Sequence, residues 1–401
     1  MDSAEREGLR PKGNVPNLRF KEFQGEWEKC KLGDLTAKVG SGSTPKGGNA
    51  VYTSAGHCFV RSQNVGMGYL ILDDVAHIND GIHQKHKATE LKEDDVLLNI
   101  TGASIGRTAI ATKEIEGGNV NQHVCIIRAN SKVSPKFLCN YIQTKKIQNY
   151  IQSLQTGGSR EGLNFEQIRS FPISLPNMAE QNKIAQLLDK LNERIATQNK
   201  IIDKLQSLIK GIVVCTILRK EKNAIVGDVC SISEQIRAEA NIDDIITVRL
   251  HGNGVCKSSA ENLQLGATQY YRRRAGQLIY GKQNFHNGAI GIVPISLDNG
   301  ITSKDIPSFD IDEMKCNSVY LLAQLQSPQY YKPAEALTTG TGSKRLKEET
   351  FLKMPIVLPN KREQDNIAVL IHRASMNLDY AKRLLELLSI QKQYLLRQMF
   401  I

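Results

Sequence analysis

The chain has 401 residues, of which 52 are lysine or arginine and 41 are aspartate or glutamate, giving a formal net charge of +11. This length suits two or three domains, and the basic balance suits a polyanionic partner, although an ordinary basic cytosolic protein would carry the same charge. The apolar runs are shorter than the roughly 18 residues needed to cross a membrane, and the eight cysteines form no CxxC pair, so a cytoplasmic protein without a zinc or redox motif is expected.

The N-terminal part of the chain predicts a tail followed by a domain. Residues 1–16 are polar and lack an apolar core, which indicates a disordered tail rather than a signal peptide. Residues 17–176 are typical of a mixed α/β domain, in which glycine-rich breaks separate short β-like runs. These runs are residues 58–61, 95–100 and 124–128. Ser134, followed by Pro135, predicts the N-terminus of a helix that continues to Leu154.

Residues 177–218 predict one long helix. Its apolar residues alternate in steps of four and three, which is the seam of a coiled coil. The seam positions are Ile184, Leu188, Leu191, Ile195, Ile202 and Leu205. About 38 residues at a rise of 1.5 Å would form a rod of roughly 57 Å, too long to bury its seam on a small domain. The helix therefore requires a helical partner.

That partner is predicted in the same chain, because the sequence repeats with an offset near 183 residues. The lead-in Pro172–Asn177 matches Pro355–Asn360, and residues 219–359 repeat the order of the first domain. Residues 360–401 form the second long helix, with seam positions Ile367, Ile371, Leu378, Leu385 and Leu388. The predicted fold is two α/β (α+β) domains, duplicated, separated by two long helices that form an antiparallel coiled coil.

Clusters of polar side chains suited to reading DNA occur in both domains. Arginine pairs well with guanine, and asparagine or glutamine with adenine, in the major groove. The first-domain candidates are Arg61, Ser62, Gln63, Asn64, Arg107, Asn121, Gln122, His123, Gly158, Ser159 and Arg160. The second-domain candidates are Arg272, Arg273, Lys282, Gln283, Asn284, Ser343, Lys344 and Arg345. Solvated loops would contain the same residue types. The Gly-x-Ser-basic pattern recurs in both copies and suits phosphate contacts.

The sequence argues against catalysis by this chain. It contains no nucleophile with a matching base and no GK[ST] ending of a P-loop, and its histidines lack metal-ligand spacing. The glycine-rich segment 101–107 suits either a backbone contact with a phosphate or a plain structural turn. No catalytic residue, metal ligand or cofactor is therefore expected in the chain itself.

The motifs together closely resemble the specificity subunits of type I restriction-modification systems. The resemblance starts in the segment 18–35 and covers nearly the whole chain, but few motifs match within residues 224–338. Its other motifs lie at residues 61–64, 98–107, 121–123 and 158–163, and in the lead-ins to the two helices.

This resemblance implies that each domain, as a target recognition domain, reads one half of an interrupted sequence in double-stranded DNA. The helices would set the spacer and dock two modification (methyltransferase) subunits, and restriction subunits would add translocation and cleavage. S-adenosylmethionine, ATP and Mg²⁺ would then belong to the partners in a DNA adenine methyltransferase and ATP-dependent endonuclease. A coiled-coil scaffold with two protein-binding domains and no DNA role is the alternative. A methyltransferase with built-in recognition is a third interpretation, but the chain lacks its cofactor motifs.

Overall fold

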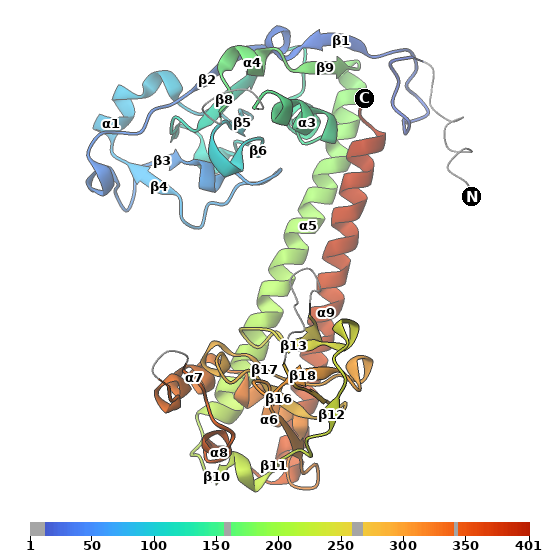
Figure 1. The fold of residues 1–401 in the computed structure, drawn as a ribbon. Coiled ribbons are helices and arrows are strands. Elements are labelled where there is room, and N and C mark those ends of the chain that lie inside the picture. Colours follow the sequence, from blue (N-terminus) through green and yellow to red (C-terminus); the bar gives the residue numbers. More distant parts are fainter. Residues whose placement is uncertain (1–12, 156–161, 259–267, 341–343) are drawn as a thin grey trace. The chain divides into compact units, whose positions relative to one another are not determined.

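The computed structural model describes residues 13–155, 162–258, 268–340 and 344–401. They form two compact units, one of residues 1–199 with 384–401 and the other of residues 200–383. Each unit contains one mixed α/β domain and a part of both long helices (Figure 1). No helix among the described residues is long and apolar enough to span a bilayer.

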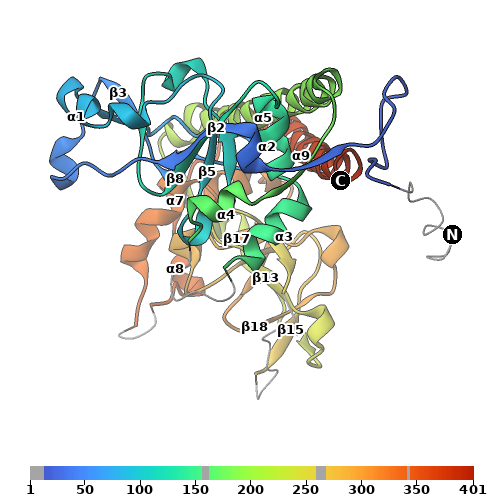
Figure 2. The same cartoon turned by 90° about the horizontal axis from the view of Figure 1, so that it is seen from above.

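Unit 1 is built on a four-stranded antiparallel sheet whose central strands are fully buried. In spatial order the strands are β2 (Thr36–Ser41), β8 (Val124–Ala129), β5 (Val96–Asn99) and β6 (Thr108–Ile110). Figure 2 shows β2, β8 and β5 side by side. A second sheet contains β4 (Ala76–Ile78), β3 (His57–Val60) and β7 (Asn119–Val120), and β1 (Glu28–Lys31) pairs with β9 (Pro172–Leu175). The predicted strands at 58–61, 95–100 and 124–128 are thus confirmed within one or two residues.

The helices of unit 1 cover this sheet and complete its core. They are α1 (Asp80–Lys85), α2 (Pro135–Ile142), α3 (Lys145–Ser153) and α4 (Phe165–Arg169). Phe137 and Tyr141 of α2 pack in one core cluster with Trp27 and with Phe400 from the C-terminus. The aromatic rings thereby tie the end of the chain to the first domain.

Two predictions for unit 1 need correction. The single helix predicted from Ser134 to Leu154 is broken at Gln143–Thr144, because the Thr144 hydroxyl accepts a bond from the Ile147 amide and begins α3 as a new helix. The predicted tail is also too long. Residues 1–12 lie outside the described residues, but the Asn14 carbonyl accepts a hydrogen bond of 2.8 Å from the Trp27 amide.

Unit 2 repeats the strand order of unit 1. Its four-stranded sheet contains β11 (Cys230–Ile232), β19 (Ser308–Ile311), β16 (Leu278–Tyr280) and β17 (Ile290–Ile292), in this order. The remaining strands are β12 (Arg237–Ala238), β15 (Tyr270–Arg272) and β18 (Ile301–Ser303) in one sheet, β13 (Ile246–Val248) with β14 (Val255–Lys257), and β10 (Ala224–Ile225) with β20 (Pro355–Ile356). The helices are α6 (Ser318–Leu325), α7 (Pro328–Tyr331) and α8 (Glu348–Leu352).

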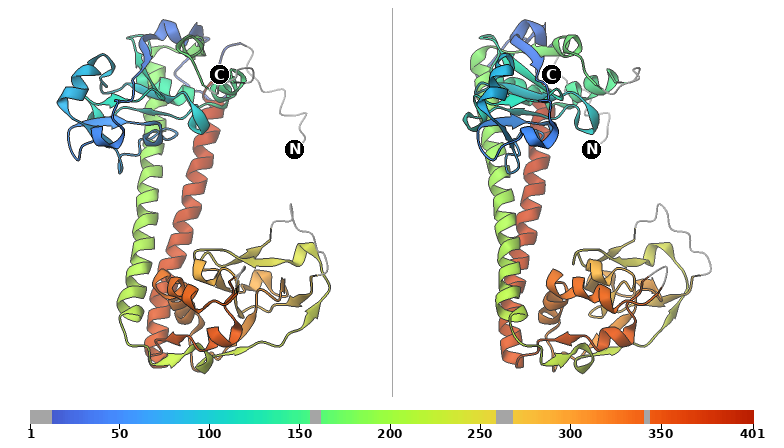
Figure 3. Two further views of the ribbon diagram at one scale, coloured as in Figure 1. Left: turned by 60° about the vertical axis from the view of Figure 1, so that its left-hand side comes forward. Right: turned by 90° about the vertical axis from the view of Figure 1, so that its left-hand side faces the viewer.

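The two long helices are α5 (Met178–Val213), which continues in a π-helical turn to Leu218, and α9 (Lys361–Gln398). In unit 1 the beginning of α5 shares a core cluster with the end of α9, through Leu188 and Leu396. In unit 2 the end of α5 shares a cluster with the beginning of α9, through Val213 and Ile371. The pairing is therefore antiparallel (Figure 3). The predicted seam residues of both helices are all buried or half-buried.

Candidate nucleic-acid interface

A hollow of about 480 Å³ lies where three loops of unit 1 meet. Because β5 and β8 are antiparallel neighbours, the turn that leaves β5 lies beside the loop that enters β8. A 3₁₀ turn at Ser62–Asn64 forms the third wall. The hollow, called the recognition hollow below, is lined by Ser62, Gln63, Thr101, Gly102, Ala103, Ser104, Arg107 and His123. Four of the predicted site residues are thus brought together from separate segments.

Buried asparagines hold these loops in place. The Asn64 side chain is 2% exposed, accepts a bond from the Arg61 amide (3.0 Å) and donates one to the Ile71 carbonyl (2.9 Å). Asn121 is also buried and accepts a bond from the His123 amide (3.1 Å). Both polar atoms of the Asn64 side chain are thus occupied within the domain, which contradicts the prediction that Asn64 contacts DNA. For Asn121 only the side-chain oxygen is occupied, and its contact with DNA stays a prediction. The hydrogen bonds of both side chains fix the backbone of the loops.

Sequence reasoning missed Asn99, the last residue of β5. Its side-chain amide donates to the Ser62 carbonyl at 2.8 Å, which links the turn after β5 to the 3₁₀ turn opposite. A polar residue at the end of an otherwise apolar buried strand is the signal that could have identified it.

The side chains of Gln63 and Arg107 are exposed, and the described residues offer neither of them a hydrogen bond or an ion pair. Gln122 accepts from the Thr44 amide (3.0 Å), and its amide nitrogen lies 3.1 Å from the His123 ring. The other ring nitrogen of His123 bonds the Thr101 hydroxyl. Gln63 and Arg107 are therefore open to a ligand, whereas His123 is positioned by its neighbours.

The remaining first-domain candidates lie around this hollow or outside the described residues. Arg61 is half-buried, with its guanidinium 5.7 Å from the centre of the Tyr52 ring and 3.4 Å from the Asp74 carbonyl. Gly158, Ser159 and Arg160 lie outside the described residues. The chain resumes at Gly162, which pairs with Thr101 at the hollow.

Unit 2 repeats the backbone pattern at the corresponding place with different side chains. The Ile100 amide donates to the His123 carbonyl, and the Leu163 amide donates to the Ile100 carbonyl. In unit 2 the Lys282 amide donates to the Asp305 carbonyl, and the Leu346 amide donates to the Lys282 carbonyl. Asp305 thus takes the position of His123, and Lys282 that of Ile100.

Three predicted basic residues of unit 2 form ion pairs within the chain. Lys282 lies 2.6 Å from Glu348 and its side chain is only 12% exposed, so it is less available than predicted. Arg345 lies 3.3 Å from Asp305, and Lys344 lies 3.6 Å from Glu335. These last two pairs are exposed and therefore weak, so a phosphate could replace the carboxylates. Ser343 lies outside the described residues.

Of the other candidates in unit 2, Arg272, Gln283 and Asn284 are exposed, but Arg273 is completely buried. Its guanidinium donates to the Thr302 hydroxyl (2.7 Å), the Ser308 hydroxyl (3.0 Å) and the Ile306 carbonyl (2.9 Å). Burial, which disfavours the charged form, lowers its pKa to about 10. The prediction that Arg273 contacts DNA is wrong, and the residue supports the fold.

Comparisons with known proteins identify similar sequences and structures. Residues 24–207 match a family model described as the type I restriction modification DNA specificity domain. The EcoBI specificity subunit of Escherichia coli is 26% identical over 139 residues, which are 33% of this chain and 28% of that protein. The MjaVIII specificity subunit of Methanocaldococcus jannaschii is 20% identical over 389 residues, 87% of each chain.

A solved structure has the same fold. The crystal structure of a type I restriction-modification S subunit from M. genitalium superposes with a TM-score of 0.63 at 12% identity and covers 96% of this chain and 99% of that one. Duplicated α/β domains, an antiparallel helix pair, the family model and these relatives agree. The whole chain therefore has the fold of a type I restriction-modification S subunit, and residues 24–207 match the DNA specificity domain of that family.

Proposed function

We propose that this chain is the DNA-reading subunit of a type I restriction-modification complex, and that each domain reads one half of an interrupted target. One observation carries the proposal for unit 1: Gln63, Arg107 and His123 converge on one open hollow from three separate loops. Glutamine can bond an adenine edge in two places, and arginine can do so with guanine or hold a phosphate. Buried asparagines pre-organise these loops, so little entropy is lost on binding.

The second half-site would be read by unit 2. Its loops keep the backbone hydrogen bonds of unit 1, but the side chains at equivalent positions differ in size and charge. A shared scaffold with different side chains is what two unlike half-sequences require. The domain thus supplies Arg272, Gln283, Asn284 and Arg345 as its candidate DNA contacts.

The outer face of α9 supports an assembly with further subunits. Large apolar side chains on this face recur at heptad spacing and remain exposed among the described residues, Tyr380 by 73% and Leu387 by 53%. The others are Val369, Met376, Ile390 and Tyr394. Exposed apolar stripes on helices are typical of helix docking sites. We assign this stripe to the modification subunits, which would supply S-adenosylmethionine and the methyl transfer, while restriction subunits would use ATP and Mg²⁺.

The proposal is tested by mapping methylated adenines in cells that express this chain with its modification subunit. An interrupted motif of two short specified parts is the expected result. A continuous motif would contradict the proposal that each domain recognises one half of the target. If no methylation occurred and the purified complex showed no salt-dependent binding to duplex DNA, the chain would be a scaffold without a DNA role.

A further inference from the structure

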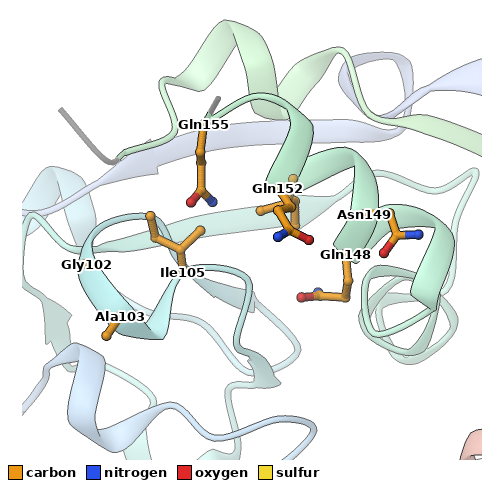
Figure 4. Close-up of a pocket in the computed structure, with 8 residues that line it drawn as sticks. Gly102, Ala103, Ile105, Gln148, Asn149, Gln152 and Gln155 are labelled. Carbon is orange, nitrogen blue, oxygen red and sulfur yellow. The ribbon is translucent and has the colours of Figure 1, made fainter. Parts of the chain in front are cut away.

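A second hollow of about 330 Å³ lies on the other side of the turn that forms the recognition hollow. One wall is the turn itself, with Gly102, Ala103 and Ile105, and the opposite wall contains Asn149 and Gln152 of α3 and Gln155 just after it. Figure 4 shows Gln152 and Gln155 on the side of α3 that faces this turn. We call this site the amide hollow.

The helix α3 has a clear division of faces. Ile147 and Ile151 are buried in the core of unit 1, while Asn149 and Gln152 face solvent. Gln148 is occupied, because its amide donates to the Gly106 carbonyl (3.0 Å) and to the Ile142 carbonyl (2.8 Å). It therefore fixes the turn against α3 and sets the width of the hollow.

The other three amides have no such role. Among the described residues no hydrogen bond is formed by the side chains of Asn149, Gln152 or Gln155. Three side chains that can both donate and accept thus line one hollow, and the described residues offer them no hydrogen bond.

The two hollows are adjacent. Gly102 and Ala103 line both of them, and both residues are exposed. Gly102 has a φ of +68°, and no atom lies within 4 Å of the place where a Cβ would stand. Gly102 therefore presents backbone without a side chain between the two hollows.

We propose that Gln152 and Gln155 are further specificity-determining residues of unit 1, which contact base edges next to those read by Gln63 and Arg107. This inference rests on the proposed function. The chemistry favours base edges over phosphates, since a neutral amide forms paired bonds with adenine but releases no counterions from the DNA backbone. The half-site read by unit 1 is accordingly longer than the recognition hollow alone would specify.

The test uses the chain assembled with its modification subunit and the motif found by the methylation map. Gln152→Ala, Gln155→Ala and the double variant should each turn a specified base of one half-sequence into a degenerate one, and leave the other half unchanged. Affinity for a duplex with the motif should fall about 5- to 150-fold, whereas affinity for a duplex with that half scrambled should stay the same. The slope of log affinity against log salt should also stay the same, because no charge is removed.

Gln186→Ala is the matched control, because Gln186 is exposed on α5 and lines neither hollow. Thermal unfolding of each variant checks the fold, and Gln152→Glu, which keeps the size of the side chain, should lose the same base preference. Unchanged motifs in all the glutamine variants would overturn the inference, as would equal losses on the cognate and scrambled duplexes. A wild-type complex that lacks any sequence preference would instead overturn the proposed function.

Discussion

Arg273 lies inside unit 2, where hydroxyl and carbonyl oxygens accept its hydrogen bonds and no carboxylate of the described residues pairs with it. Arg273→Ala would leave these acceptors unpaired and open a cavity, so we expect it to lower the free energy of unfolding by about 2–5 kcal/mol. The exposed neighbour gives the control: Arg272→Ala should change stability by about 0.5 kcal/mol or less. Urea unfolding of both variants measures the difference, and equal effects would contradict the assigned role of Arg273.

The three consecutive arginines also show where sequence reasoning failed at this scale. Side chains of an extended segment point alternately to opposite faces, so Arg272 and Arg274 are exposed while Arg273 points inward. Consecutive arginines look like one basic surface in the sequence, and only the extended backbone separates their faces. In unit 1 the same reasoning identified the loops of the recognition hollow, but it could not separate exposed Gln63 from buried Asn64. That distinction depends on tertiary hydrogen bonds.

Gln63 and Arg107 should respond differently to truncation, although both line the recognition hollow. Gln63→Ala should cost about 1–3 kcal/mol on the cognate duplex and almost nothing on random DNA, because an amide contributes only base-specific bonds. Arg107→Ala removes a positive charge, so it should weaken binding to both and lower the salt slope by about one unit or less. Binding titrations of the assembled complex at several salt concentrations measure both effects. Equal losses on cognate and random DNA for Gln63→Ala would make Gln63 a solvated loop residue.

At the scale of elements, periodicity predicted the long helices well because a seam of two helices is a local pattern. Domain helices were predicted less well. The segment 134–154 is predicted as one helix, yet Thr144 begins a new helix within it. Threonine is an ordinary helix residue by propensity, so only the capping bond to Ile147 reveals the break. In unit 2, Pro328 begins α7, and this helix start is visible in the sequence because proline favours the first turn of a helix.

The seam of α9 contains one residue that its heptad position does not favour. Lys392 is 9% exposed in unit 1, and burial lowers the pKa of its ammonium group. The equivalent residue of α5, at an offset of 183, is the apolar Ile209. Lys392→Met keeps the length of the side chain without its charge, so it should raise the melting temperature near neutral pH.

The pH dependence checks the cause. A lysine with a lowered pKa in the folded state destabilises that state while it is charged, and this cost is relieved as pH rises from the folded pKa toward about 10.5. The advantage of Lys392→Met should therefore be full near neutral pH and shrink in alkaline solution. An advantage that does not change with pH would attribute the effect to packing alone. If Lys392→Met does not raise the melting temperature at any pH, the folded protein stabilises the charged ammonium group of Lys392.

At the scale of the whole molecule, the duplication made the architecture predictable from one chain. The offset of 183 residues brought the two lead-ins, the two helices and the glycine-rich segments before them into register, and the strand orders of the two sheets agree with it. What the sequence could not supply is the recognised DNA. The corresponding loops of the two domains share their backbone hydrogen bonds, so the bases that they recognise depend on their side chains. One side chain can bond more than one base, and the DNA sequence therefore cannot be deduced from single positions.

Under the proposed function, the length of the helix pair sets the length of the spacer between the two DNA half-sites, and a deletion can test this. Each helix has one end in unit 1 and the other in unit 2, and residues 198–204 of α5 and 378–384 of α9 each contain the boundary between the units. Deleting both segments removes one heptad from each helix and keeps the flanking seams in phase.

Seven residues at a rise of 1.5 Å shorten the pair by about 10 Å, and base pairs rise about 3.4 Å. The methylation map of the double deletion should therefore show a spacer about three base pairs shorter, with both half-sequences unchanged because neither segment belongs to a reading loop. Deletion in α5 alone leaves the two seams unequal in length, so that variant should unfold at a lower temperature and give little methylation. If the double deletion folds, assembles and keeps the original spacer, these helices do not measure the gap between the half-sites.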